Sequence, residues 1–163
     1  MIEWTCPQDR CVLPLKDSIL RWLGTPYGRG SIPGMSSDCV QLPAAVLDMV
    51  YYNKIGVTAV PTLPLNSAIA GVGSWTQIVL AYRKGWGQFG GSIRVRDNTV
   101  FPGDIIVCPF WSRSVNGGAG HLMIASWNPM EFFHSTSNLG AHITKFDSSR
   151  PTIARYRVKE GWS

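Results

Sequence analysis

The chain has 163 residues, a formal net charge of +5 and a hydrophobic fraction of 45%. This length fits one domain with a single core, which we assign to residues 1–163, and the apolar content excludes a disordered chain. Lysine and arginine are scattered, no apolar run approaches the ~20 residues of a membrane span, and residues 1–7 lack the blocks of a secretory signal. We therefore expect no nucleic-acid partner, no membrane insertion and no signal peptide.

The N-terminal part of the chain is predicted to be helical. Residues 17–24 have the pattern of a short helix, which Asp17 or Ser18 can cap at its N-terminus and Gly24 can end. Residues 25–34 are rich in glycine and proline and predict a loop.

A second helix is predicted over residues 39–52, with Ser37 or Asp38 as its N-cap. Pro43 lies near the start of this segment, so the helix either is kinked there or becomes regular only later. The spacing of apolar side chains predicts a third helical segment over residues 67–84.

After these helices the pattern changes to one that is typical of strands: residues 92–96 alternate between polar and apolar, and residues 104–110 form a compact apolar run. We predict six strands, at 92–96, 104–110, 120–126, 130–134, 141–146 and 153–158. Helices followed by several short strands favour an α+β domain, with N-terminal helices packed on a mostly antiparallel sheet.

Four cysteines are too few for a disulfide-dense scaffold of this length. Cys6 and Cys11 are close enough to pair or to bind a metal, but an isolated C-x4-C is a weak zinc motif. No metal and no cofactor is therefore predicted. Cys108 lies in an apolar strand and is interpreted as a small core residue. Cys39 could be a core residue, half of a disulfide, a metal ligand or a nucleophile.

The histidines decide between these possibilities for Cys39. A nucleophilic cysteine needs a lowered thiol pKa, which a helix N-terminus and a nearby imidazolium supply. His121 begins one predicted strand and His134 ends the next, so a turn at 128–129 can bring the two side by side. His121 could then contact the thiol, and His134 could orient the imidazole of His121. His142 is interpreted as structural. Each residue alone also fits an ordinary structural role, so spacing leaves both interpretations open.

Five short motifs resemble, in order, those of the NlpC/p60 cysteine peptidases. They are LGTPYGRG at 23–30, DC at 38–39, PGDII at 102–106, GHLMI at 120–124 and FHS at 133–135. The resemblance extends from about residue 18 to residue 158, nearly the whole chain.

This resemblance implies a papain-like α+β fold and hydrolysis of peptidoglycan stem peptides, at the bond between γ-D-glutamate and diaminopimelate or lysine. By motif, Cys39 corresponds to the nucleophile, His121 to the base and His134 to the third, orienting residue. Tyr27 and Asp38 correspond to positions associated with substrate binding.

The chain departs from the family pattern in two places. Val40 and Gln41 follow Cys39 where the family usually has Ser-Gly, and Met123 replaces a glycine. The layout most resembles a subgroup from phage tails and gene-transfer particles, which implies a virion location, other tail proteins as possible partners, and action at the bacterial wall. A structural tail-tip or hub module with little or no catalysis, an antibacterial amidase effector, and acyl transfer in place of hydrolysis remain alternatives.

Overall fold

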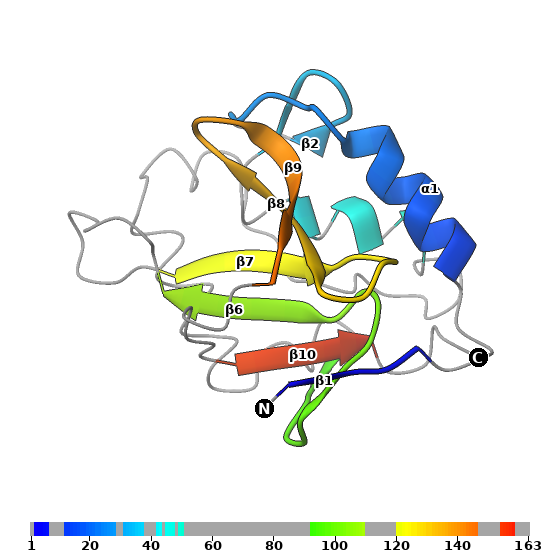
Figure 1. The fold of residues 1–163 in the computed structure, drawn as a ribbon. Helices are drawn as coiled ribbons and strands as arrows, with labels where there is room; N and C mark the ends of the chain where they lie inside the picture. The colour runs from blue at the N-terminus through cyan, green and yellow to red at the C-terminus, as the bar shows by residue number, and fades with distance from the viewer. Residues whose placement is uncertain are drawn as a thin grey trace.

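An N-terminal helix packs on a six-stranded antiparallel sheet in the computed structural model (Figure 1). The structure describes residues 2–6, 12–28, 31–37, 42–43, 45–47, 49–50, 92–109, 120–146 and 154–158. The predicted α+β class is confirmed. The elements are β1 (Glu3–Trp4), α1 (Val12–Trp22), β2 (Ser31–Ile32), β3 (Ser36–Ser37), β4 (Ser92–Arg94), β5 (Thr99–Val100), β6 (Ile105–Pro109), β7 (Gly120–Ala125), β8 (Glu131–Thr136), β9 (Gly140–Lys145) and β10 (Ala154–Val158).

The main sheet has the order β4-β10-β6-β7-β8-β9, and each neighbouring pair is antiparallel. In Figure 1 the β8–β9 hairpin rises across the direction of β6 and β7. All six predicted strands are confirmed, with ends that differ by a few residues. Two small pairs, β1 with β5 and β2 with β3, lie outside this sheet and were not predicted.

Helix α1 begins at Val12, so the prediction that Asp17 or Ser18 caps it is wrong. Pro14 falls in the first turn, where a missing N–H leaves no hydrogen bond unmade. Ser18 is buried inside the helix, and its hydroxyl donates to the carbonyl oxygen of Val46 at 2.9 Å. The predicted end is confirmed, because Gly24 follows the last turn with a φ of 84°.

The second predicted helix is described only in part. Leu42 and Pro43 are helical and buried, and residues 45–47 and 49–50 are helical as well. The start of this segment and the predicted helix at 67–84 lie outside the described residues. Among the helices that the structure describes, none is long and apolar enough to cross a membrane.

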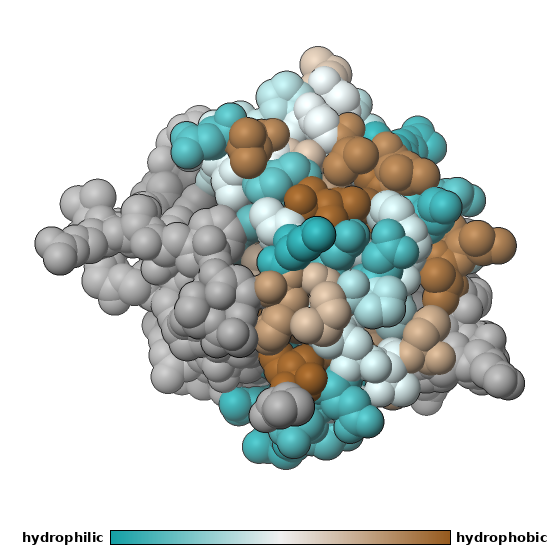
Figure 2. Space-filling model, in the orientation of Figure 1, coloured by the Kyte–Doolittle hydropathy of each residue, from teal (hydrophilic) through white to brown (hydrophobic). Residues whose placement is uncertain are grey.

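Exposed apolar side chains are dispersed over the described surface. In the view of Figure 2, brown residues form separate groups with teal and white residues between them. The large apolar side chains that are exposed are Leu13, Leu20, Leu23, Met35, Met49, Ile93, Met130 and Leu139.

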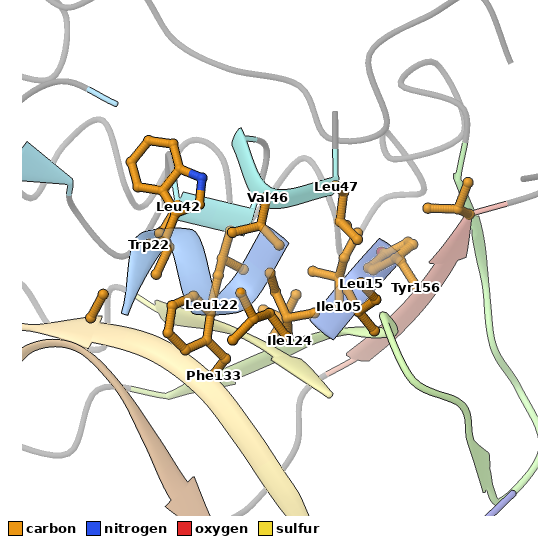
Figure 3. Close-up of a cluster of buried hydrophobic side chains, with 14 residues drawn as sticks. Leu15, Trp22, Leu42, Val46, Leu47, Ile105, Leu122, Ile124, Phe133 and Tyr156 are labelled. Atoms are coloured by element: carbon orange, nitrogen blue, oxygen red, sulfur yellow. The ribbon is translucent and has the colours of Figure 1, made fainter. Parts of the chain in front are cut away.

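The main core lies between the helices and one face of the sheet (Figure 3). Apolar residues from α1 and from the helical residues after 41 meet alternate residues of β6 and β7 there, together with Phe133 of β8. Burial of each large side chain contributes roughly 1.5–3 kcal/mol to stability. The members include Leu15, Ile19, Trp22, Leu42, Val46, Leu47, Ile105, Val107, Leu122, Ile124, Phe133, Ala141, Tyr156 and Val158.

A smaller apolar cluster occupies part of the opposite face of the sheet. It contains Val100, Ile106, Met123, Ala125 and Phe132, with Ile2, Trp4 and Phe146 packed against it. Met123 is 4% exposed in this cluster. The central strands are therefore buried on both faces, which explains why they are apolar almost throughout.

The Pro102-Gly103 turn before β6 is held by a buried ion pair. The N–H of Asp104 donates to the carbonyl oxygen of Phe101 at 3.0 Å, and Gly103 has a φ of 87°, as a type II turn requires. The Asp104 carboxylate is fully buried; it accepts from the Phe101 N–H at 2.9 Å and from Arg157 at 2.9 and 2.8 Å. The guanidinium also lies over the Phe101 ring, 3.5 Å from its centroid.

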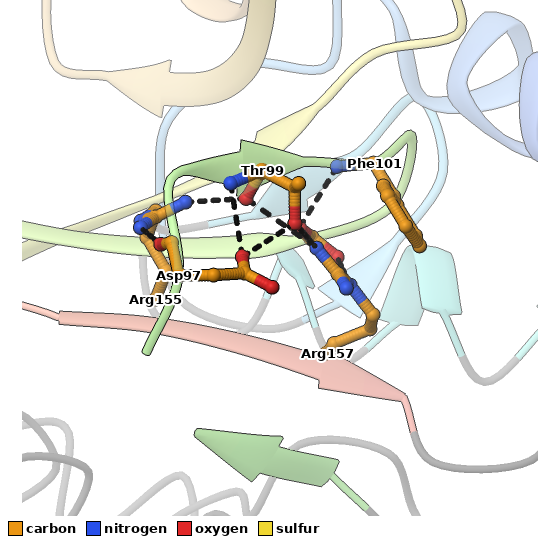
Figure 4. Close-up of polar contacts among 6 residues, drawn as sticks. Asp97, Thr99, Phe101, Arg155 and Arg157 are labelled. Atoms are coloured by element: carbon orange, nitrogen blue, oxygen red, sulfur yellow. Dashed lines mark hydrogen bonds and ion pairs between the residues drawn. The ribbon is translucent and has the colours of Figure 1, made fainter. Parts of the chain in front are cut away.

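Further hydrogen bonds connect this turn to β5 and β10 (Figure 4). Arg157 donates to the Thr99 hydroxyl at 3.2 Å, and Arg155 donates to the carbonyl oxygens of Thr99 and Asp97. Asp97 accepts from the hydroxyl and the N–H of Thr99, and these two hydrogen bonds lower the pKa of its carboxyl group. The network fixes the start of β6, the strand beside β7.

Candidate active site

Two buried histidines from neighbouring strands contact each other directly. Nε2 of His121 on β7 lies 2.7 Å from Nδ1 of His134 on β8, and the rings meet edge to face at 75°. His121 is 4% exposed and His134 is fully buried. The predicted proximity of these two rings is confirmed by the hydrogen bond, whereas their chemical roles stay a prediction.

The strand register explains why these side chains meet. Ile124 on β7 is paired with Phe133 on β8. Side chains alternate between the faces of a sheet, so Leu122, Ile124 and Phe133 enter the main core. His121 and His134 occupy the alternate positions of these two strands, so their side chains share one side of β7 and β8.

Strand β9 adds two polar side chains around His134. His142 is directly opposite His134 in the register, and the two ring centroids are 4.5 Å apart. Nδ1 of His142 donates to the carbonyl oxygen of Gly140 at 2.8 Å. The hydroxyl of Thr144 lies 3.1 Å from Nε2 of His134. Both ring nitrogens of His134 thus have a polar partner.

Thr144 was not predicted as a site residue from the sequence. Its spacing from His142 is the signal that could have indicated it. It lies two residues after His142, so it shares the histidine face of β9. A threonine in a strand is ordinary, because β-branched residues favour strands. Only the pairing of β9 with β8 shows that this hydroxyl faces an imidazole.

Of the other predicted residues, some lie within the described ranges and others lie outside them. Asp38 and Cys39 lie outside the described residues, between the end of β3 and the helical Leu42. Tyr27 is half-buried and packs against the main core. Cys108 lies in β6 as the register partner of His121, which confirms its predicted strand.

The possible pairing of Cys6 with Cys11 remains a prediction. Cys6 is exposed, and Cys11 lies outside the described residues.

The loop that carries Tyr27 is attached to β9 through Thr25. The carbonyl oxygen of Thr25 accepts from the Ala141 N–H at 2.9 Å, and the Gly24 N–H donates to the Ala141 carbonyl oxygen at 2.8 Å. The Thr25 hydroxyl also accepts from the Gly34 N–H at 2.9 Å, which fixes the far side of the loop. The strand that bears His142 and Thr144 therefore also holds the Tyr27 loop.

Gly140 makes this attachment possible, and Gly140→Ala is expected to disrupt it. A Cβ at Gly140 would lie 2.4 Å from the Thr25 carbonyl oxygen, and the φ of +66° is strained for any other residue. We expect a loss of about 2–4 kcal/mol in the free energy of unfolding, measured by urea denaturation.

The matched control is Gly34→Ala. Gly34 has a similar φ of +79°, but nothing lies within 4 Å of an added Cβ. This control should show the backbone strain without the overlap. Equal losses in the two variants would contradict the role of the close contact with Thr25.

The arrangement around His134 suits proton transfer by a base that another side chain orients. A buried imidazole with a fixed hydrogen bond on one nitrogen can exchange a proton through the other. Within the described ranges, no group of three histidine, cysteine, aspartate or glutamate side chains could hold a metal ion.

Comparison with known proteins finds similarity in structure only. No family model matches the chain, and no curated protein matches its sequence. Among solved structures, NlpC2 and NlpC1 from Trichomonas vaginalis are similar at 17% and 16% identity, with TM-scores of 0.56 and 0.57 and 91% and 96% of this chain covered. A protein from Staphylococcus aureus described as similar to lipoprotein, NLP/P60 family, is 19% identical, with a TM-score of 0.57 and 94% covered.

These likenesses show the fold. The chain spans 45%, 47% and 43% of the lengths of those three structures, which is less than half of each. The match covers nearly all of the present chain, so the helix-and-sheet arrangement described above is the arrangement that the three structures share with it.

Proposed function

We propose that the chain is a cysteine peptidase that hydrolyses peptidoglycan stem peptides, with Cys39 as nucleophile, His121 as base and His134 as the residue that orients the base. The observation that carries this proposal is the 2.7 Å hydrogen bond between the buried rings of His121 and His134. This contact supports a base with an orienting group beside it, in a fold similar to structures whose titles name NlpC or the NLP/P60 family.

The proposed reaction uses the ring nitrogen of His121 that does not face His134. Nδ1 of His121 takes the proton of the Cys39 thiol, and the thiolate sulfur attacks the carbonyl carbon of the scissile amide. When the tetrahedral intermediate collapses, the C–N bond breaks and His121 returns the proton to the leaving amine. A water molecule, deprotonated by His121, then hydrolyses the thioester and regenerates the thiol.

The substrate that we propose is the bond between γ-D-glutamate and diaminopimelate or lysine. The motifs around Tyr27 and Asp38 support this choice, because they resemble positions that bind the substrate in the NlpC/p60 peptidases. The attachment of the Tyr27 loop to β9 is consistent with it, since the loop and the strand beside His134 are held together.

Digestion of purified cell walls tests the function. We expect the protein to release fragments with a new amino terminus on diaminopimelate or lysine and a new γ-carboxyl group on glutamate, identified by mass spectrometry of the muropeptides. Walls of both chemotypes should be used, because they differ at this bond. A folded protein with an unmodified thiol that releases no such fragment from either wall would contradict the proposal.

We also propose that the enzyme acts from a phage or phage-like tail, where it opens the wall locally during genome delivery. The support is the Cys39-Val40-Gln41 sequence, which resembles the tail-associated subgroup more than the forms that have Ser-Gly after the cysteine.

A further inference from the structure

We propose that Thr144 is a positioning residue that holds His134 in the one tautomer that lets His121 act as a base. The proposal rests on the function proposed for His121 and adds a residue that the motifs do not include. Its basis is a chain of two hydrogen bonds, from Nε2 of His121 to Nδ1 of His134 at 2.7 Å and from Nε2 of His134 to Oγ1 of Thr144 at 3.1 Å.

Each neutral imidazole ring carries a single proton, and its position determines the direction of both hydrogen bonds. A neutral imidazole carries one N–H, so one of its nitrogens donates and the other accepts. If Nδ1 of His121 is to take a proton from a thiol, the proton of the neutral ring must be on Nε2. That N–H then points at His134, whose Nδ1 must be the acceptor.

The same reasoning fixes the far side of His134. With Nδ1 as acceptor, the proton of His134 is on Nε2 and needs an acceptor of its own, because this ring is fully buried. The Thr144 hydroxyl lies at hydrogen-bond distance from Nε2, and a hydroxyl can accept while its own hydrogen turns elsewhere.

The reverse arrangement would disable the base. If His134 carried its proton on Nδ1, that N–H would donate to Nε2 of His121, and neutral His121 would carry its own proton on Nδ1. It could not then accept the proton of a thiol, and its imidazolium form would have an N–H pointing at another N–H. The tautomer of His134 therefore decides whether His121 is active.

The titratable groups facing His134 are few among the described residues. His121 faces it from β7 and His142 from β9, with the ring of His142 4.5 Å away and its Nδ1 bonded to the carbonyl oxygen of Gly140. The pH profile of a variant without the Thr144 hydroxyl must therefore be compared with that of a variant that keeps both His142 and a hydroxyl at residue 144.

The kinetic test compares Thr144→Val, which has nearly the same shape but no hydroxyl, with Thr144→Ser, which keeps it. We expect Thr144→Val to lower kcat for stem-peptide cleavage about tenfold and to leave KM within about twofold, because one hydrogen bond is lost away from the substrate. The alkaline limb of the kcat profile should move to lower pH, since His134 no longer favours protonated His121. Thr144→Ser should restore both within about twofold.

Nuclear magnetic resonance tests the tautomer directly, whether or not the protein cleaves anything. The chain has three histidines, so ¹⁵N-labelled imidazoles give three ring systems that His121→Gln and His142→Gln variants can assign. Spectra of Cys39→Ala protein near pH 8, above the ordinary histidine pKa of about 6.5, should show His134 protonated on Nε2. In Cys39→Ala/Thr144→Val protein the Nδ1–H form should become populated.

Two results would overturn the inference. One is that His134 is protonated on Nδ1 in the Cys39→Ala protein. The other is that Thr144→Val has the same kcat, pH profile and His134 tautomer as the protein with Thr144. If Thr144→Val loses its fold, circular dichroism will show this, and activity will fall without a shift of the alkaline limb of the kcat profile. In that case Thr144→Ser, which keeps the hydroxyl, tests the inference. Failure of the proposed function is distinguishable, because it appears as absent cleavage by the unsubstituted protein while the tautomer spectra still report on Thr144.

Discussion

Replacing Cys39 by alanine is expected to abolish cleavage of stem peptides, with a fall in kcat of at least about 10³-fold. Alanine has no atom that can form the thioester, so His121 and His134 are left with no nucleophile to activate. The measurement is the rate of appearance of the new amino terminus, with folding checked by circular dichroism. Fold and stability should stay close to those of the unsubstituted protein, because the change removes a single sulfur atom.

Cys6→Ala is the matched control, because Cys6 is exposed and belongs to the N-terminal segment beside β1. It should keep full activity. Iodoacetamide at neutral pH should modify Cys39 faster than Cys6, and in a His121→Gln variant this difference should shrink, since the thiolate loses its imidazolium partner. Activity retained in Cys39→Ala, or a Cys39 that reacts no faster than Cys6, would contradict the nucleophilic role.

The same substitution separates an enzyme of the tail from a structural tail module. Particles that carry Cys39→Ala should assemble normally and should be impaired in crossing the wall, if catalysis is what the chain contributes. Particles that infect normally with Cys39→Ala, and fail to assemble when the chain is deleted, would favour the structural module.

Asp104→Ala is expected to cause the largest loss of stability, about 3–5 kcal/mol in the free energy of unfolding. The carboxylate is fully buried and binds Arg157 through two hydrogen bonds, while Arg157 is 15% exposed. Removing the carboxylate leaves the guanidinium without its buried partner and the Phe101 N–H without an acceptor. Urea denaturation followed by tryptophan fluorescence measures the change.

Asp97→Ala is the comparison for this prediction. Asp97 belongs to the same network, yet its carboxylate is exposed to solvent. The loss of stability should therefore be much smaller than for Asp104, because water replaces the missing partner. Similar losses in the two variants would mean that the buried ion pair contributes little beyond the turn it holds.

Much of the sheet could be predicted because strand patterns, such as the alternation at 92–96 and the compact apolar run at 104–110, are local properties. The strands that carry His121 and His134 follow each other along the chain, which already indicates neighbouring strands. The contact between the two rings followed from that reasoning. Their strands are joined by a short turn, so no information from distant residues was needed.

What the sequence did not predict depends on partners far away in the chain. Ser18 has the chemistry of an N-cap, but the helix begins at Val12, and the Ser18 hydroxyl donates to the carbonyl oxygen of Val46 instead. Strands β1 and β5 have two residues each, too few for any periodicity to show. Thr144 has an ordinary sequence context and gains its meaning only from the ring of His134 opposite.

The alternation along β8 has a consequence for how this hairpin can vary in length. Phe133 enters the main core while His134 faces His121, so a slip by one residue would exchange an apolar ring for an imidazole in the core. Such a slip would cost several kcal/mol through desolvation of the imidazole alone. Insertions and deletions in related chains should therefore be confined to the turn at 137–139, outside both strands, while the spacing from Phe133 to His134 and from Gly140 to Thr144 stays fixed.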